Sequence, residues 1–272
     1  MSIHEYDSAL RPPRALEELL DLFHNRPLLA ALVARNVKIR YKRSVLGVFW
    51  TLAQPAAMLV VLSFVFSRVF APHAPLYPAY AGAGLIVWYF FAQTTTVIVA
   101  EVAGGVELWR RVRMPKTAFA VATLCTGLLN LAIATLIFLA ALAIARVPLG
   151  WPLLTLPVVA LLAAMFALGL ALLLASVALR FPDVADLYAV VLTVWMFLTP
   201  VIYPRSILPD AAAPLIALNP MSLFVEAFRR PLYENAAASP LSFASMFAVA
   251  ACTLLAGWYV FARSADQIPY RG

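Results

Sequence analysis

Charged residues are scarce in this sequence. Asp, Glu, Lys and Arg make up 12% of its 272 residues, whereas hydrophobic residues make up 64%, and the mean hydropathy is +0.90. A water-soluble domain of this size needs far more polar surface to cover its core. The scarcity of charge therefore excludes a soluble globular domain and indicates a membrane protein.

Three other absences narrow the function. None of the ten glycines precedes a lysine, so there is no GxxxxGK[ST] loop to hold the phosphates of ATP. The apolar stretches carry no Asp, Lys, Arg or His at their centres, which disfavours an ion-coupled carrier; their one acid, Glu101, lies near a helix end. Cys125 and Cys252 stand inside apolar stretches without a CxxC motif, so we expect no metal or redox site.

The chain contains six stretches free of charge that are long enough, or nearly long enough, to cross a bilayer. They run over 44–67, 69–100, 117–145, 147–179, 187–204 and 235–262. We expect an all-α membrane protein with six transmembrane helices, the fifth of them short. A leader (1–43) precedes this transmembrane domain (44–263), and a tail (264–272) follows it. The Leu- and Ala-rich helices over 117–145 and 153–179 are predicted to be a lipid-facing scaffold.

The distribution of Lys and Arg predicts the orientation. With six helices, one side of the membrane receives the leader, the 104–116 loop, Arg180 and the tail, which hold most of the 20 cations. The other side receives only Arg68, Arg146, Arg205, Arg229 and Arg230. The positive-inside rule then places both termini in the cytoplasm. The net charge of +7 reflects this asymmetry and does not indicate binding of nucleic acid.

The leader is predicted to lie along the membrane surface. In "RALEELLDLF", Leu16, Leu19, Leu20 and Phe23 share one helical face opposite three acids. After Pro27 an amphipathic basic segment follows, whose cations would meet anionic headgroups. These cations are Arg35, Lys38, Arg40, Lys42 and Arg43. A simple anchor that fixes the orientation of helix 1 is an equally good interpretation.

Two residues of the first apolar stretch indicate that it faces an interior. Pro55 removes a backbone hydrogen-bond donor about two turns into the helix, and Gln54 places an amide beside the gap. Lipid cannot satisfy these groups, whereas protein or water can.

The segment 204–240 combines six prolines with apolar runs such as "APLIALNPMSLFVEAF". It is too broken to span the bilayer and too apolar for a free loop. We expect a pair of short helices between helices 5 and 6 that re-enter the outer leaflet. A helix lying on the outer surface is the alternative.

A membrane enzyme acting on lipid phosphates is the rival from another class. Asp183 and Asp186 in "RFPDVAD" lie one turn apart and could hold Mg²⁺. We favour a simpler interpretation, in which both acids stabilise the N-terminus of helix 5.

Several stretches, in order along the chain, resemble the membrane subunit of type-2 ABC exporters of polysaccharides such as O-antigen, capsule or teichoic acid. They are "RNVKIRYKRSVLGVFWTLAQP" (35–55), "LWRRVRMPK" (108–116), "RFPDV" (180–184), "TPVIYP" (199–204) and "LNPMSLFVEAFR" (218–229). The ordered set covers about residues 28 to 263. One departure lies in the 104–116 loop, where Glu107, Trp109 and Met114 replace the usual Asn, aliphatic and aromatic residues.

The resemblance implies a homodimer that binds two separate nucleotide-binding subunits. ATP and Mg would be bound there, with no cofactor in this chain and no catalytic residue. The expected cargo is a lipid-linked, O-antigen-like polysaccharide that moves out of the cytoplasm; other cargoes of related permeases are drugs, haem and lipids.

The resemblance also implies that the 104–116 loop couples this chain to the nucleotide-binding subunit. Leu108 and Trp109 would enter a groove on that subunit, and Arg110 and Arg111 would pair with acids around it. The full coupling set is Glu107, Leu108, Trp109, Arg110, Arg111, Met114 and Pro115, with Arg180 and Asp183 as a second contact. An ordinary cytoplasmic loop with an interfacial Trp is the alternative.

Helices 1 and 5 are expected to line the channel, since sugars stack on aromatic rings and bond to amides. The candidates are Phe49, Trp50, Gln54, Tyr188, Trp195 and Tyr203. For each aromatic residue alone, an interfacial belt or simple packing is the better interpretation.

Four residues are assigned to an outer gate: Pro200, Asn219, Pro220 and Met221. Pro200 is predicted to kink helix 5 near its outer end. Asn219 and Pro220 are predicted to begin a short helix as N-cap and first-turn proline.

Overall fold

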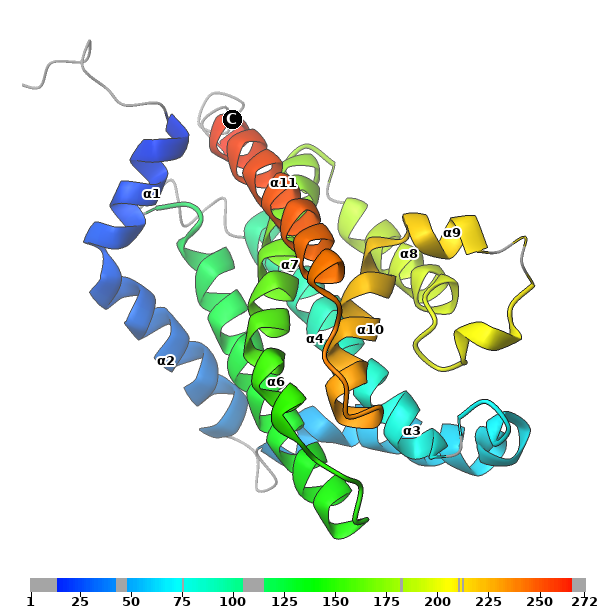
Figure 1. Cartoon of the computed structure of the whole chain (residues 1–272). Coiled ribbons are helices and arrows are strands. Elements are labelled where there is room, and N and C mark those ends of the chain that lie inside the picture. The colour runs from blue at the N-terminus through cyan, green and yellow to red at the C-terminus, as the bar shows by residue number, and fades with distance from the viewer. Residues whose placement is uncertain are drawn as a thin grey trace, which may run out of the picture.

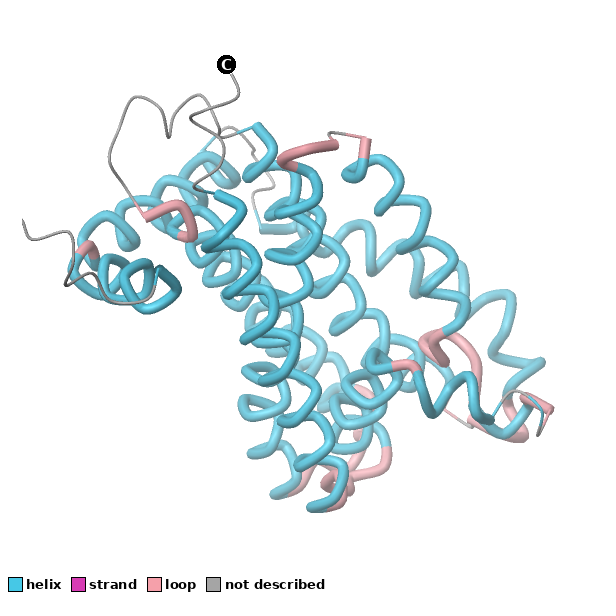
Figure 2. Tube along the Cα trace, turned by 90° about the horizontal axis from the view of Figure 1, so that it is seen from above, coloured by secondary structure: helices cyan, strands magenta, loops and turns pink. Residues whose placement is uncertain are grey.

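A computed structural model of the chain describes residues 14–42, 48–74, 76–104, 115–181, 183–209, 211 and 213–265. Over these residues every regular element is a helix (Figures 1 and 2). The α-helices are α1 (Arg14–His24), α2 (Arg26–Lys42), α3 (Val48–Phe70), α4 (Tyr77–Gly104), α6 (Ala118–Ile144), α7 (Leu156–Ala178), α8 (Val184–Leu198), α9 (Ala213–Leu218), α10 (Pro220–Tyr233) and α11 (Pro240–Ala265). Two short 3-10 helices, η2 (Trp151–Thr155) and η3 (Arg205–Ile207), complete the described part.

Five of the described helices are long and apolar enough to cross a membrane. The segments are Ala53–Phe70, Tyr77–Val102, Ala118–Ile144, Trp151–Ala178 and Pro240–Ser264. The 15 residues of α8 would span about 22 Å, short of the roughly 30 Å hydrocarbon core. The all-α, multi-pass membrane fold is confirmed, and a crossing by α8 as the sixth helix stays a prediction.

The centre of the bundle is formed by α4 and α7. Helix α4 packs against α3, α6, α7, α8 and α10, while α7 packs most extensively against α11. The predicted lipid-facing scaffold is wrong for α7, which is largely buried; for α6, whose most apolar part is little buried in this chain, it stays a prediction. A helix buried in a membrane bundle is as apolar as one that faces lipid, so composition alone does not separate the two.

The leader helices pack beside the bundle rather than within it (Figure 1). Helix α2 packs against α6, and α1 against α11. Leu22 and Leu32 are buried against Ala118, Phe119 and Ala122 of α6. The apolar side chains predicted to share one face of α1, among them Leu20 and Phe23, are exposed in the chain. An exposed apolar face is what an interfacial helix requires, and the position of α1 on the membrane surface stays a prediction.

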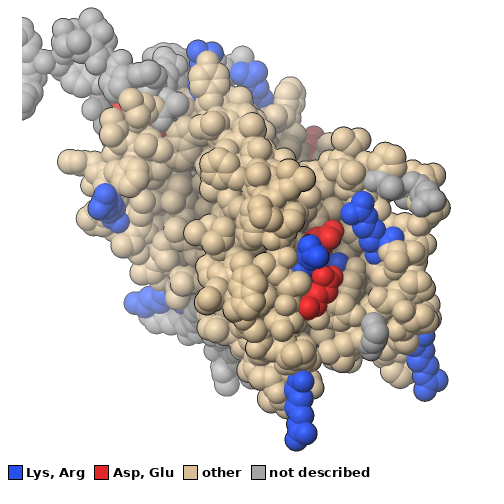
Figure 3. Space-filling view, viewed as in Figure 1, with Lys and Arg blue, Asp and Glu red and all other residues tan. Residues whose placement is uncertain are grey.

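Helix α3 contains Pro55 in its interior, as expected. It packs against α4, but little of it is buried by this chain. The expected interior is thus not supplied by a single chain along most of α3. Figure 3 shows how few charged residues one face of the molecule carries, with scattered cations and one place where acidic and basic residues lie together.

The connection between α8 and α11 contains the two short helices that the proline pattern indicates, α9 and α10. Their re-entry into the membrane stays a prediction. The predicted kink at Pro200 is wrong, because α8 ends at Leu198, before the proline. Thr199 is extended (φ −105°, ψ 132°), since the ring of a proline disfavours helical backbone in the residue that precedes it.

Candidate functional site

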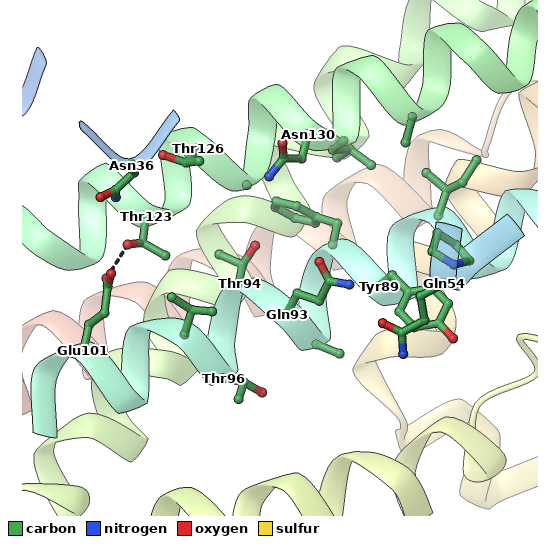
Figure 4. A pocket seen from close by; sticks show the side chains of 18 of the residues that line it. Asn36, Gln54, Tyr89, Gln93, Thr94, Thr96, Glu101, Thr123, Thr126 and Asn130 are labelled. Carbon is green, nitrogen blue, oxygen red and sulfur yellow. Dashed lines mark hydrogen bonds between the residues drawn. The ribbon is translucent and has the colours of Figure 1, made fainter. Parts of the chain in front are cut away.

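A groove of about 840 Å³, lined by both apolar and polar side chains, lies between α2, α3, α4 and α6 (Figure 4). Its polar side chains come from all four helices. They are Arg35, Asn36, Gln54, Tyr89, Gln93, Thr94, Thr96, Glu101, Thr123, Thr126 and Asn130. Such a concentration of amides and hydroxyls within apolar spans is costly in lipid unless it serves a bound group or water.

Helical spacing brings these side chains to one groove. On α4, Tyr89, Gln93 and Thr96 recur every three or four residues, and on α6 Thr123, Thr126 and Asn130 do so as well. Residues at this spacing share a helix face. The sequence analysis named Gln54 and Glu101 but missed Gln93 and Asn130. The matching polar stripes of the two helices are the signal that could have found them.

The groove is closed at the end where α6 begins. There the Thr123 hydroxyl donates a hydrogen bond to a carboxylate oxygen of Glu101 (Figure 4). Close to this point, a Cβ on Gly127 would overlap the hydroxyl of Thr94, so glycine lets α6 approach α4. Glu101, the acid among the described lining residues, thus bonds to a neighbour across the helix pair.

The residues predicted to line the channel lie in different surroundings in the structure. Gln54 lines the groove beside Tyr89. Tyr188 is instead buried and donates a 2.8 Å hydrogen bond to Thr95, so it packs α8 against α4 and does not line an open surface. The half-buried Tyr203 donates to the carbonyl of Phe197.

Trp195 is also a packing residue. Its ring lies 5.4 Å from Phe91 and 6.3 Å from Trp88, edge to face in both cases. Phe49 and Trp50 belong to the first turn of α3, and their side chains lie outside the described part of the chain.

Asn219 anchors the predicted gate to the end of α8. Its side-chain oxygen accepts from the Met221 amide at 3.1 Å and from the Trp195 indole at 2.8 Å. Its amide nitrogen donates to Thr199 Oγ1 at 2.8 Å and to the carbonyl of Leu198 at 3.2 Å. The predicted N-cap is confirmed, with Pro220 in the first turn. The bonds to α8 could not be foreseen from sequence.

Arg229 is a second anchor of α10, which the sequence analysis did not single out. It is 4% exposed, and its guanidinium carbon lies 3.7 Å from the centroid of the Tyr80 ring. It donates to the carbonyl and hydroxyl of Tyr80 and to the carbonyls of Pro200 and Val201. A Cβ on Gly84 would overlap the guanidinium. Arg229 therefore joins α10 to α4 and to the turn after α8.

The predicted coupling loop lies mostly outside the described residues. This holds for Glu107, Leu108, Trp109, Arg110, Arg111 and Met114, whereas Pro115 is described and buried. Next to it, the Thr117 amide and hydroxyl donate to Glu18 Oε1 at 2.8 and 3.1 Å. Burial raises the pKa of the Glu18 carboxyl, and these hydrogen bonds offset part of the shift.

The other expected contacts are only partly visible. Asp183 occupies the N-cap position of α8 and Asp186 its first turn, but the Asp183 side chain forms no capping hydrogen bond. Arg35 lies 5.9 Å from the ring centroid of Phe119 and lines the groove, and Lys38 is exposed. Arg40 and Lys42 belong to α2, with side chains outside the described part, and Arg43 lies outside it altogether.

A helical bundle with five helices that could cross a membrane, and with polar side chains lining a groove between its helices, is typical of a membrane permease. Residues 27–233 match the family described as ABC-2 type transporter. The match covers well over half of the 272 residues. The chain belongs to this family.

Similar proteins are described as O-antigen export system permease protein RfbA. The one from Myxococcus xanthus is 30% identical over 218 residues, covering 79% of this chain and 84% of that protein. Two from Klebsiella pneumoniae are 23% identical over 210 residues, with coverages of 76% and 80%, and 22% identical over 204 residues, with coverages of 74% and 78%.

Proposed function

We propose that this chain is the membrane subunit of an ABC exporter that moves a lipid-linked, O-antigen-like polysaccharide across the bacterial inner membrane. The observation that carries the proposal is the similarity to O-antigen export permeases over about three quarters of the chain. The groove supports it, because hydroxyls and amides inside a membrane bundle suit a hydroxylated cargo.

Two copies of the chain would form the pathway together with two nucleotide-binding subunits. The small share of α3 that is buried by its own chain leaves a long apolar surface for a second copy or for lipid. ATP and Mg would bind to the partner subunits, because this chain has no phosphate loop. Both termini would lie in the cytoplasm, as the distribution of cations favours.

The test reconstitutes the chain in proteoliposomes with the nucleotide-binding subunit encoded beside it. A prenyl-diphosphate-linked polysaccharide serves as the cargo. We expect ATP-dependent protection of the glycan from an added glycosidase, and no ATP hydrolysis by the chain alone. A different result would be an assembled complex that hydrolyses ATP and protects no glycan, while a drug, haem or a plain phospholipid stimulates its ATPase activity. That result would overturn the proposal that the cargo is a polysaccharide.

A further inference from the structure

The groove gathers four neutral amides, one from each of its four helices, beginning with Asn36 of α2. Gln54 comes from α3, Gln93 from α4 and Asn130 from α6, and all four line the same cavity (Figure 4). Gln93 and Asn130 are half-buried, whereas Gln54 is exposed. An amide carries two donors and an acceptor, so the groove offers both kinds of hydrogen bond at a depth where lipid chains offer neither.

The charge of the groove selects the class of ligand. Among the lining residues that the structure describes, Arg35 and Glu101 are the charged ones, and Glu101 accepts a hydrogen bond from Thr123. The remaining polar groups are amides and hydroxyls, beside the aromatic rings of Tyr89 and Phe90. Neutral donors and acceptors next to aromatic rings suit a polyhydroxylated ring, whose hydroxyls bond and whose C–H faces stack on the aromatics. An acyl chain offers no hydrogen bond to such groups.

The length of the groove fits a ligand that stays attached to lipid. Along α4 the lining extends from Glu101 to Ile86, a distance of about 22 Å at the helical rise. It therefore runs from the end where α6 begins to beyond the middle of a core about 30 Å thick. A headgroup could occupy the groove while its lipid tail remains in the bilayer.

We propose that the groove between α2, α3, α4 and α6 is a binding subsite for the first sugars of the lipid-linked cargo. It is separate from the face of α8, since Tyr188, Trp195 and Tyr203 do not line it. The inference rests on the proposed function, which supplies the cargo, and assigns to Gln93 and Asn130 the role of binding its hydroxyls.

The test uses the complete exporter, with a photo-cross-linking amino acid placed singly at Gln93 or Asn130. The probe is a radiolabelled prenyl diphosphate that carries a trisaccharide. The comparison positions are Phe247 on α11 and Val194 on α8, which are more exposed than Gln93 and Asn130, at 58% and 54%. Co-elution with the nucleotide-binding subunit shows that each variant has folded and assembled.

We expect the probe to label positions 93 and 130 much more than 247. Unlabelled glycolipid should compete, and prenyl phosphate without sugar should not. In a binding assay with the same probe, Gln93→Leu and Asn130→Leu should each weaken binding roughly five- to tenfold, the effect of one lost hydrogen bond.

Three outcomes would overturn the inference in different ways. Labelling confined to position 194 would place the sugars on α8 and leave the proposed function intact. Equal competition by prenyl phosphate would make the groove a lipid site. A complex with active ATPase that is labelled at none of the positions, and does not bind the probe, would overturn the groove and the proposed cargo together.

Discussion

Gly169 of α7 and Gly257 of α11 lie face to face where the two helices cross. A Cβ on Gly169 would overlap the backbone of Thr253 and Leu254, and one on Gly257 would overlap the backbone of Gly169. Small residues of this kind let helix backbones approach closely in membranes, where packing replaces the hydrophobic effect as the source of stability. The pair therefore holds the two most closely associated helices of the bundle together.

Gly169→Ala should lower the thermal stability of the purified protein, because the added methyl group forces α7 and α11 apart. The expected loss is roughly 1–3 kcal/mol, as for other overpacked cores. The control is Gly104→Ala, where a Cβ would meet nothing within 4 Å. Equal melting temperatures for the two variants would show that the helices adjust freely at the crossing.

Asn219→Ala should loosen the predicted gate. The substitution removes the cap of α10 and its bonds to Trp195 and Thr199, and loss of an N-cap alone costs about 0.5–2 kcal/mol. We expect assembled protein that leaks small solutes in a liposome assay. The control is Ser239→Ala. Ser239 precedes α11, and its exposed hydroxyl accepts a hydrogen bond from the amide of Ser242 in the first turn of that helix. If liposomes containing the Asn219→Ala variant do not leak small solutes, α10 does not close the pathway.

Arg229→Lys should destabilise the protein although it keeps the charge. Lysine has no planar fork to reach Tyr80, Pro200 and Val201 together, so buried carbonyls are left unpaired at about 1–3 kcal/mol each. Arg230→Lys is the control, because Arg230 is half-buried and pairs with Glu234 at 3.0 Å. The melting temperature of each variant is the measurement. An unchanged melting temperature for Arg229→Lys would contradict the role of Arg229 as an anchor of α10.

Glu18 should make the packing of α1 depend on pH. Its carboxyl has a raised pKa in the folded chain, chiefly because it is buried. The folded chain therefore binds the proton more tightly than the unfolded chain, so the contact is strongest below the ordinary pKa of Glu and weakens as pH rises through the raised value.

Glu18→Gln should remove this dependence and keep an acceptor for Thr117, whereas Glu18→Ala should lose the contact at every pH. Hydrogen exchange of α1 measured across the acidic range reports both effects. Glu17→Gln, at the neighbouring position, is the control. Identical pH profiles for the native chain and Glu18→Gln would remove Glu18 as the cause.

The double variant Trp109→Ala, Arg110→Glu should uncouple export from ATP hydrolysis without unfolding the bundle. The reversed charge would oppose the acids expected on the nucleotide-binding subunit. Co-purification with that subunit and export of glycan are the measurements. If both remain unchanged in the double variant, the loop only fixes the orientation of the chain.

The sequence by itself determined that this is a helical membrane protein, because long charge-free stretches have no other stable form in a bilayer. It also determined local features that depend on a few neighbouring residues. The cap at Asn219 is one, since an Asn followed by proline favours the start of a helix. The segmentation of the leader at Pro27 is another, with α1 ending at His24 and α2 beginning at Arg26.

Only the tertiary structure decided which helices are central and which polar groups meet. The sequence could not show that α7 is buried, since lipid and a protein interior accept the same side chains. It could not show that Gln93 and Asn130 line one groove, because this depends on how α4 packs against α6. Nor could it show that Arg229 bonds to Tyr80, because this depends on how α4 packs against α10. Proline at position 200 ended α8 rather than bending it, because the backbone of Thr199 is extended and the turn after it is held by Arg229.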